Sequence, residues 1–176
     1  MLKLGVVSDT HKHITNLSRA LDFLKSEGAS MFIHLGDDYT DPEEIGEHDF
    51  VRIPGVFSAT YTDESIPNRL IKNVVGWRLF LTHTLSSHPN DLPGDIRPED
   101  IINGRRADAV FFGHTHVPEI KEDYGIVFMN PGHLKNDDKR GSPPTFAYIE
   151  LSMNRMIIRI HKLLEFEILK EHTFRR

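Results

Sequence analysis

The sequence predicts one α/β or α+β domain in which helices cover a sheet. In the first third of the chain, short apolar runs typical of strands alternate with a helical pattern. In the last third, the pattern is almost entirely β. No repeat, low-complexity tract or linker divides the 176 residues, and this length is enough for a single domain with a sizeable core. Strands and helices that alternate early, followed by strands, are typical of layered folds of these two classes.

The N-terminal elements are expected in the order strand, helix, strand. Residues 2–7 are apolar and end at Ser8, which is typical of a buried strand. Leucine and alanine then recur at helical spacing, and Gly28 is placed to stop that helix. Three further elements are predicted, a strand, a short helix and a strand, at 31–35, 42–48 and 50–53.

The remainder of the chain is mostly β in pattern. Residues 70–75 and 77–82 predict a hairpin, followed by a helix at 98–106 and a strand at 109–112. Four later strands are predicted at about 119–122, 125–129, 145–151 and 154–161. We expect a single domain over residues 1–176 with its core in about 2–161. The charged tail, 162–176, has no clear pattern, so its packing is left open.

Composition narrows the class of protein. The 39% hydrophobic and 27% charged residues are typical of a globular chain, and no apolar window approaches membrane-spanning length. No signal peptide is evident, so a cytoplasmic location is expected. The net charge of −5, with lysine and arginine dispersed, argues against binding a long nucleic acid. Because cysteine is absent, disulfides and thiolate metal sites are excluded.

Potential metal ligands or hydrogen-bonding groups follow directly after five predicted strands. At the carboxyl ends of strands, loops converge on a site, and strand ends hold side chains more accurately than free loops do. One histidine after a strand would be weak evidence, but the full order of these motifs predicts a functional site. The groups are Asp9-Thr10-His11, Asp37, His83, His114-Thr115-His116 and Asn130.

The two carboxylates and four imidazoles of this set suit divalent metal ions. They are enough for two ions that share one bridging carboxylate. Two such ions, about 3.5–4 Å apart, clamp both sides of an in-line displacement at phosphorus, and a hydroxide held between them is a nucleophile at neutral pH. Ligands of these types accept Mn²⁺, Fe²⁺, Ni²⁺ or Zn²⁺.

The same motifs, in this order, resemble those of the calcineurin-like metallophosphoesterases, in particular the small single-domain phosphodiesterase branch of the YfcE/MJ0936 type. The resemblance covers about residues 2–151 and includes Asn130-Pro131-Gly132 before a strand at 143–151. It implies a two-sheet β-sandwich flanked by helices, with the metal site at the carboxyl ends of the strands.

The resemblance also implies a role for each ligand. His11 and His83 could alternatively orient a metal ligand from outside the coordination shell. Two divalent ions are expected, with Mn²⁺ as the first candidate and Ni²⁺, Fe²⁺ or Zn²⁺ as alternatives. The implied ligands are Asp9, His11 and His116 for the first metal, Asp37 as the bridge, and His83 and His114 for the second metal.

One family motif is missing. Where the family has Gly-Asn-His-Asp or Gly-Asn-Cys-Asp, this chain has Gly55-Val56-Phe57-Ser58, so Val56 replaces a metal-binding Asn and Phe57 replaces a His or Cys. Thr84, which replaces a glycine, is expected to narrow the approach to the site. Three readings stay open: a weak second site, a scaffold without catalysis, or another oxygen donor. The donor candidates are Ser58, Thr60, Asp63 and Asn68.

We therefore expect a metal-dependent phosphodiesterase that acts on a small phosphoester, with Asp37 and His83 acting through the metal centre. A metal-bound hydroxide would attack phosphorus in line. No side-chain general acid is identified, which predicts a preference for good leaving groups. The alternative is a metal-binding scaffold that engages a protein partner, as the retromer subunit resembling this family does. No membrane partner is expected, and a homo-oligomer stays open.

Other polar residues are assigned lesser roles. His34 is expected to pack in the core, and His133 to lie near the site, where contact with phosphate is the lesser alternative. Asn130 is expected to shape a turn near the site. Lys139 and Arg140 could hold an anionic substrate, but their spacing selects neither.

Overall fold

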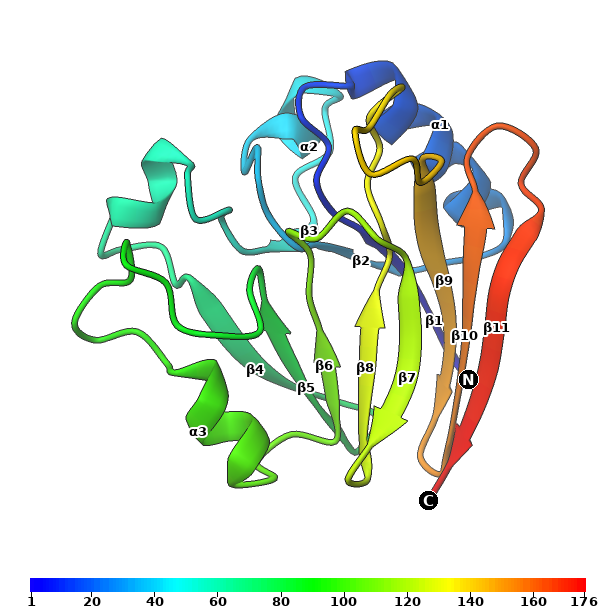
Figure 1. Cartoon of the computed structure of the whole chain (residues 1–176). Coiled ribbons are helices and arrows are strands. Elements are labelled where there is room, and N and C mark those ends of the chain that lie inside the picture. Colours follow the sequence, from blue (N-terminus) through cyan, green and yellow to red (C-terminus); the bar gives the residue numbers. More distant parts are fainter.

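The structure is a computed structural model that describes residues 1–176 and contains two β-sheets packed face to face (Figure 1). The first sheet has six strands, in the order β11-β10-β9-β1-β2-β3. Strands β1, β2 and β3 are parallel, whereas β9 runs antiparallel to β1. The strands of this sheet are β1 (Leu2–Val7), β2 (Met31–His34), β3 (Phe50–Arg52), β9 (Thr145–Ser152), β10 (Arg155–Lys162) and β11 (Ile168–Arg175).

The second sheet has five strands, in the order β4-β5-β6-β8-β7. Its three central strands, β5, β6 and β8, are parallel, and the two outer strands are antiparallel to their neighbours. The strands are β4 (Arg69–Val74), β5 (Trp77–Thr82), β6 (Ala109–Phe111), β7 (Glu119–Asp123) and β8 (Ile126–Asn130).

Successive side chains along each strand point to opposite faces of the sheet, and this alternation separates the core between the sheets from the cores under the helices. Leu79 and Leu81 of β5 join the core between the two sheets, while Phe80 points to the opposite face and packs with Ile101 of helix α3 (Pro98–Asn103). In the first sheet, Val6 faces the other sheet, and Val7 packs against helix α1 (Ile14–Ser26). Each sheet thus buries one face against the other sheet and part of its second face under a helix.

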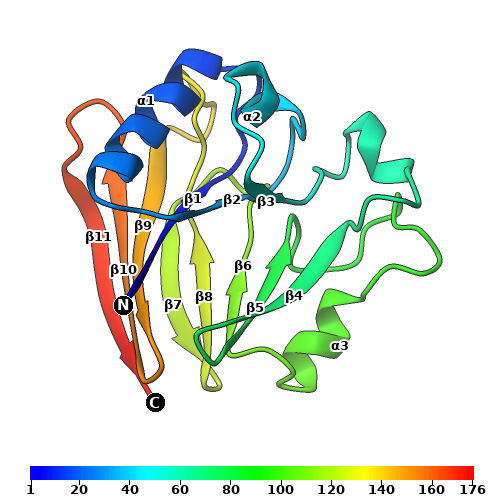
Figure 2. The same ribbon diagram turned by 180° about the vertical axis from the view of Figure 1, so that it is seen from behind.

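The helices lie on the outside of this sandwich (Figure 2). Helix α1 buries Leu17, Ala20, Leu21 and Leu24, which recur at the spacing of one helical face. No helix is long and apolar enough to cross a membrane. The helical segments are α1 (Ile14–Ser26), α2 (Asp41–Glu44), α3 (Pro98–Asn103) and a 3₁₀ turn at Ala59–Thr62.

Most of the elements expected from the sequence are present, and the two-sheet, helix-flanked fold class is confirmed. Two helices are shorter than predicted. The predicted helix 42–48 is limited to Asp41–Glu44, and the predicted helix 98–106 ends at Asn103, just before Gly104.

The tail left open by the sequence is ordered. Residues 168–175 form β11, which pairs antiparallel with β10 from Arg155 opposite Arg175 to His161 opposite Ile168 (Figure 1). Within β11 only Phe174 is buried, and it joins the core between the sheets. A strand with one buried side chain has no visible alternation, which is why the sequence pattern did not predict it.

Parallel pairing brings the loops after these strands to one place. In the first sheet Val7 lies opposite His34, so the chain leaves β1 and β2 at the same level. In the second sheet Leu81 lies opposite Phe111, and Phe111 opposite Met129. The residues that follow these positions therefore meet at the carboxyl ends of both sheets.

Candidate metal centre

The six predicted ligands converge at this edge of the sandwich. Four of them form one compact group in which the ligand atoms all lie within 4.8 Å of one another. His83 and His114 lie beside this group, with His83 Nε2 and His114 Nδ1 3.3 Å apart. The compact group is Asp9, His11, Asp37 and His116.

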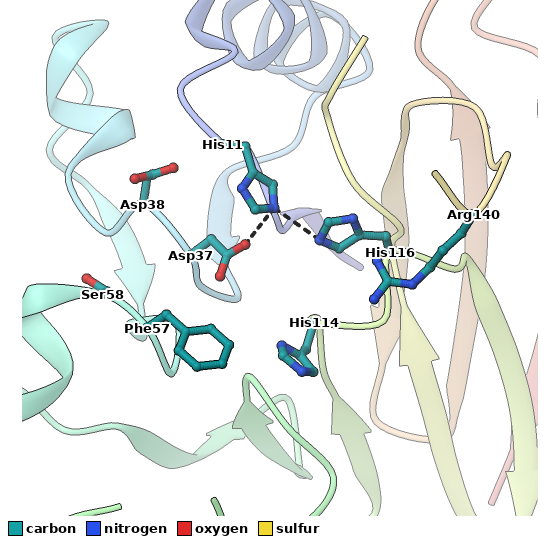
Figure 3. Close-up of a pocket in the computed structure, with 8 residues that line it drawn as sticks. All are labelled: His11, Asp37, Asp38, Phe57, Ser58, His114, His116 and Arg140. Carbon is teal, nitrogen blue, oxygen red and sulfur yellow. Dashed lines mark hydrogen bonds and ion pairs between the residues drawn. The ribbon is translucent and has the colours of Figure 1, made fainter. Parts of the chain in front are cut away.

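Three members of the compact group, His11, Asp37 and His116, point toward one another in Figure 3. His11 Nε2 lies 2.7 Å from Asp37 Oδ2 and 3.0 Å from His116 Nε2. His116 Nε2 is in turn 3.2 Å from Asp9 Oδ1. Two carboxylates and two imidazoles converging in this way match the oxygen and nitrogen ligands that divalent transition metals prefer.

Asp37 contacts both His11 of the compact group and His83 of the neighbouring pair. Its Oδ2 faces His11, whereas its Oδ1 lies 3.2 Å from His83 Nε2. The two oxygens of one carboxylate therefore point to different sets of imidazoles. This is the geometry that a bridging carboxylate requires.

Hydrogen bonds outside the centre fix two of the imidazole rings. His83 Nδ1 lies 2.8 Å from the carbonyl oxygen of Leu35, and His116 Nδ1 lies 2.5 Å from Asp138 Oδ2. Because each acceptor requires a proton on Nδ1, both rings keep the lone pair of Nε2 directed at the centre.

Asp138 is a functional candidate that the sequence did not reveal. Its side chain is 2% exposed, although it lies in the polar loop before β9. It contacts His116 and accepts a hydrogen bond from the backbone N–H of Arg140. Nothing in the sequence marks it, because Asp138 follows no strand and stands beside the similar Asp137.

The centre is electrostatically asymmetric. Burial opposes protonation of His83 and His116, but the carboxylates of Asp37, Asp9 and Asp138 outweigh burial and raise the pKa of both rings. For His114, burial and the neighbouring His83 lower the pKa. Burial would raise the pKa of Asp37, yet contacts with His11 and His83 lower it. The lowered pKa of Asp37 keeps its carboxylate ionised, so this side chain offers a negative charge to a bound cation.

The backbone at the site is strained. Positive φ angles are uncommon for residues other than glycine, and they concentrate at functional sites, where the surrounding structure enforces them. Five of the six predicted ligands have them; only His83 does not. The φ angles are 51° for Asp9, 47° for His11, 73° for Asp37, 67° for His114 and 61° for His116.

Glycine permits two of these loops to approach each other. A Cβ on Gly113 would collide with Ser8 Oγ and would lie 2.7 Å from Asp9 Oδ2. A Cβ on Gly55 would collide with the backbone of Asp37. Both glycines stand at places where a side chain would displace a predicted metal ligand.

The missing family motif leaves a specific gap. Val56 is buried, and its carbonyl oxygen accepts a hydrogen bond from Asn90 Nδ2. Of the four proposed oxygen donors, Ser58 lines the metal pocket, with its hydroxyl 2.6 Å from that of Thr60. Asn68 instead binds the Tyr61 carbonyl and Asp95, and Asp63 binds Ser65.

The pocket over the centre has a volume of about 320 Å³ (Figure 3). This is near the lower limit for a small-molecule site. Thr84, expected to narrow the approach, is buried and donates a hydrogen bond to the Ser86 carbonyl oxygen, and it does not line the pocket. The lining residues are His11, Asp37, Asp38, Phe57, Ser58, His114, His116 and Arg140.

The structure also shows where the residues with lesser expected roles lie. His34 is fully buried, as expected for a core histidine. Asn130 Nδ2 donates hydrogen bonds to the Gly113 carbonyl and to Thr115 Oγ1, so it shapes the loop that carries His114 and His116. His133 is buried, with Nε2 3.0 Å from the Ser142 carbonyl oxygen, and does not line the pocket.

This fold, with a cluster of aspartate and histidine at the carboxyl ends of its strands, is that of a metallophosphoesterase. The calcineurin-like phosphoesterase superfamily domain matches residues 2–154. The chain belongs to this superfamily, as the resemblance of its motifs predicts.

Individual relatives agree with this assignment. The chain is 27% identical over 149 residues to the phosphodiesterase MJ0936 of Methanocaldococcus jannaschii, covering 74% of this chain and 83% of that protein. Its fold matches the crystallised phosphoesterase YfcE of E. coli with a TM-score of 0.71 at 21% identity, over 97% of this chain and 98% of that one. Vps29 of Chaetomium thermophilum matches with a TM-score of 0.72 at 15% identity, over 100% and 96% of the two chains.

Proposed function

We propose that this protein is a metal-dependent phosphodiesterase with a dinuclear centre. The observation that carries the proposal is the position of Asp37, whose two oxygens face two different sets of imidazoles. The relatives named phosphodiesterase support the same reaction class.

The ligands divide into two sets under this proposal. The first ion would be held by Asp9, His11, His116 and Asp37, the group whose donor atoms lie closest together. The second would be held by Asp37, His83 and His114, and Ser58 is the remaining candidate for the oxygen that Val56 cannot supply. Mn²⁺ is the ion that we propose, although His and Asp ligands also accept Ni²⁺, Fe²⁺ and Zn²⁺.

Bound divalent ions supply a nucleophile at neutral pH, by lowering the pKa of water, and stabilise negative charge on the phosphoryl oxygens. The chain itself fixes the ligand geometry. Leu35 and Asp138 hold the His83 and His116 rings in the orientation and tautomer that the ligand sets require. Arg140 lines the pocket and adds a cation that can hold a phosphoryl oxygen.

No side chain is placed to protonate the leaving group, because Phe57 occupies the position where the family has His or Cys. We therefore expect diesters with good leaving groups, such as p-nitrophenyl esters, to be cleaved much faster than dialkyl esters. Initial rates for bis(p-nitrophenyl) phosphate and dimethyl phosphate test this expectation. Equal rates would show that the protein supplies its own general acid.

The proposed activity is tested by hydrolysis of bis(p-nitrophenyl) phosphate with metal-stripped protein titrated with Mn²⁺. We expect activity to rise with Mn²⁺ and to vanish in His116→Ala. His48→Ala is the matched control, because His48 is exposed and does not line the pocket. Absence of hydrolysis at all Mn²⁺ concentrations would refute the proposed function.

A second candidate function is a metal-binding scaffold for a protein partner. It is favoured by the absence of the usual Asn and by Phe57, an apolar side chain that is 75% exposed at the pocket. The similarity to Vps29 concerns the fold only. Protein that binds one ion and hydrolyses no phosphodiester would support the scaffold over the enzyme.

A further inference from the structure

Phe57 is an exposed aromatic side chain inside the metal pocket. Its exposed fraction is 75%, although its neighbour Val56 is buried. The backbone on either side is fixed, since the Val56 carbonyl accepts from Asn90 Nδ2 and the Ser58 N–H donates to the Gly55 carbonyl. The ring therefore stands on a rigid turn and does not fold into the core.

The surroundings of Phe57 leave room for a planar partner. His88 packs against it edge-on, with ring centroids 5.3 Å apart and an interplanar angle of 89°. The His114 ring lies on the side of the metal centre, 6.3 Å away and tilted by 40°. This separation lies in the upper part of the range of about 4.5–7 Å that aromatic pairs adopt. The Phe57 ring is thus flanked by His88 and His114, yet its side chain remains 75% exposed beside the proposed second-metal ligands.

Arg140 forms another wall of the same pocket (Figure 3). Its side chain is 52% exposed, and Nη1 lies 4.0 Å from Asp138 Oδ2, beyond hydrogen-bond distance. Its guanidinium N–H groups are therefore available to an anion. Lys139, the next residue, does not line the pocket. Arginine binds phosphoryl oxygens through several N–H donors in one plane.

We propose that Phe57 and Arg140 select the substrate, which is a phosphoester bearing a planar aromatic group: the ring stacks on Phe57 while Arg140 binds a phosphoryl oxygen. This inference rests on the proposed function and narrows its substrate class. A pocket of about 320 Å³ is large enough for a small phosphoester of this kind. Phe57 has no polar atom, so it recognises the π-face of the ring, which a nucleobase and a simple aryl group share.

The test of Phe57 compares two ligands that differ mainly in planarity. Phenylphosphonate and cyclohexylphosphonate have similar apolar volume and the same charged group, and neither has a phosphoester bond to hydrolyse. By calorimetry with Mn²⁺-loaded protein, we expect phenylphosphonate to bind about 3- to 10-fold more tightly. In Phe57→Leu, which keeps an apolar side chain but loses the ring, that preference should disappear. A preference absent from the native protein, or unchanged in Phe57→Leu, would overturn the proposal.

The test of Arg140 uses the same two ligands. Arg140→Gln should weaken both phosphonates by a similar factor of about 10, because it removes a charged donor to the shared phosphonate group. Lys139→Gln is the matched control on the same loop and should leave both affinities unchanged. Equal effects of the two substitutions would contradict a specific role for Arg140.

A second pair of ligands distinguishes the two possible sources of the aromatic ring, a nucleobase and a simple aryl group. If the ring of the natural substrate is a nucleobase, adenosine 5′-monophosphate should bind more tightly than ribose 5-phosphate, and Phe57→Leu should remove that difference. If only the phenyl ligand shows the preference, the natural substrate is an aryl ester, and the selection by Phe57 still holds.

Failure of this inference is distinguishable from failure of the proposed function. Without any Mn²⁺-dependent hydrolysis of bis(p-nitrophenyl) phosphate, the proposed function fails. With hydrolysis intact and the phenyl preference insensitive to Phe57→Leu, only the selection of aromatic groups fails.

Discussion

The two halves of the candidate metal centre differ in completeness. One half, Asp9, His11 and His116 around Asp37, gathers four ligand atoms within 4.8 Å of one another. The other half offers His83 and His114 with the second oxygen of Asp37, and Val56 stands where an additional ligand would be expected. Both halves are built in the same way, from residues that directly follow strands.

The difference indicates that one ligand set of the candidate centre is anchored in the buried core, whereas the other set borders the pocket. The complete half depends on Asp9, which is fully buried and accepts a bifurcated hydrogen bond from the backbone N–H of His114 through both carboxylate oxygens. The incomplete half borders the pocket, and Phe57 of the same turn is largely exposed. We expect the first half to bind metal more tightly than the second.

The largest effect is expected where the two halves meet. Asp37→Asn removes the charge that both ligand sets share, so we expect affinity for Mn²⁺ to fall by more than about 100-fold and hydrolysis to be lost. Calorimetry measures the affinity. Asp38→Asn, next in the chain and also lining the pocket, is the control. Retention of two bound ions in Asp37→Asn would disprove a bridging role.

Two substitutions, one in each half of the candidate centre, test whether the two halves differ in their affinity for metal. We expect His114→Ala to retain one bound Mn²⁺ per chain, because it leaves the compact group intact, and His11→Ala to weaken the tighter site. Metal content after dialysis at low Mn²⁺, measured by atomic emission, tests both variants. Identical metal content in the two variants would mean that the halves are equivalent.

A smaller effect is expected from Asp138, which holds the His116 ring from outside the cluster. Asp138→Asn should reduce Mn²⁺ affinity by about 10- to 100-fold, the usual range for partners that orient a metal ligand. The nitrogen resonances of His116 should also shift, since the tautomer is no longer fixed. Asp137→Asn is the control, because Asp137 is the exposed neighbour in the same loop. Comparable losses in the two variants would argue against a positioning role.

The smallest effect concerns His34, a buried histidine beside the centre that is not one of the proposed ligands. Burial lowers its pKa from the ordinary 6.5 to about 4. The unfolded chain therefore takes up this proton first as the pH falls. The resulting loss of stability begins near pH 6.5 and is complete near pH 4.

In metal-free protein, we expect His34 to contribute a slope of about 1.4 kcal/mol per pH unit over this window. Denaturant unfolding from pH 7 to pH 4.5 measures it. His34→Gln cannot titrate, so its stability should fall less steeply with pH than that of the native protein. Parallel slopes would mean that His34 is protonated in the folded state.

The sequence predicted six candidate ligands, and the structure brings them together, because each lies just after an apolar strand, where the position of a side chain is set by the sheet. It did not predict Asp138, or choose Arg140 over Lys139, because the loop that carries them has no hydrophobic pattern. The four oxygen candidates near the missing motif could not be separated until the fold placed only Ser58 at the pocket. Strand β11 was missed because Phe174 is its one buried residue.

The central claim is that two ion sites share Asp37. Crystals grown with Mn²⁺ and measured for anomalous scattering test it most directly. The account predicts two peaks about 3.5–4 Å apart, one beside Asp9, His11 and His116 and the other beside His83 and His114. A single peak, or peaks that do not both contact Asp37, would contradict it.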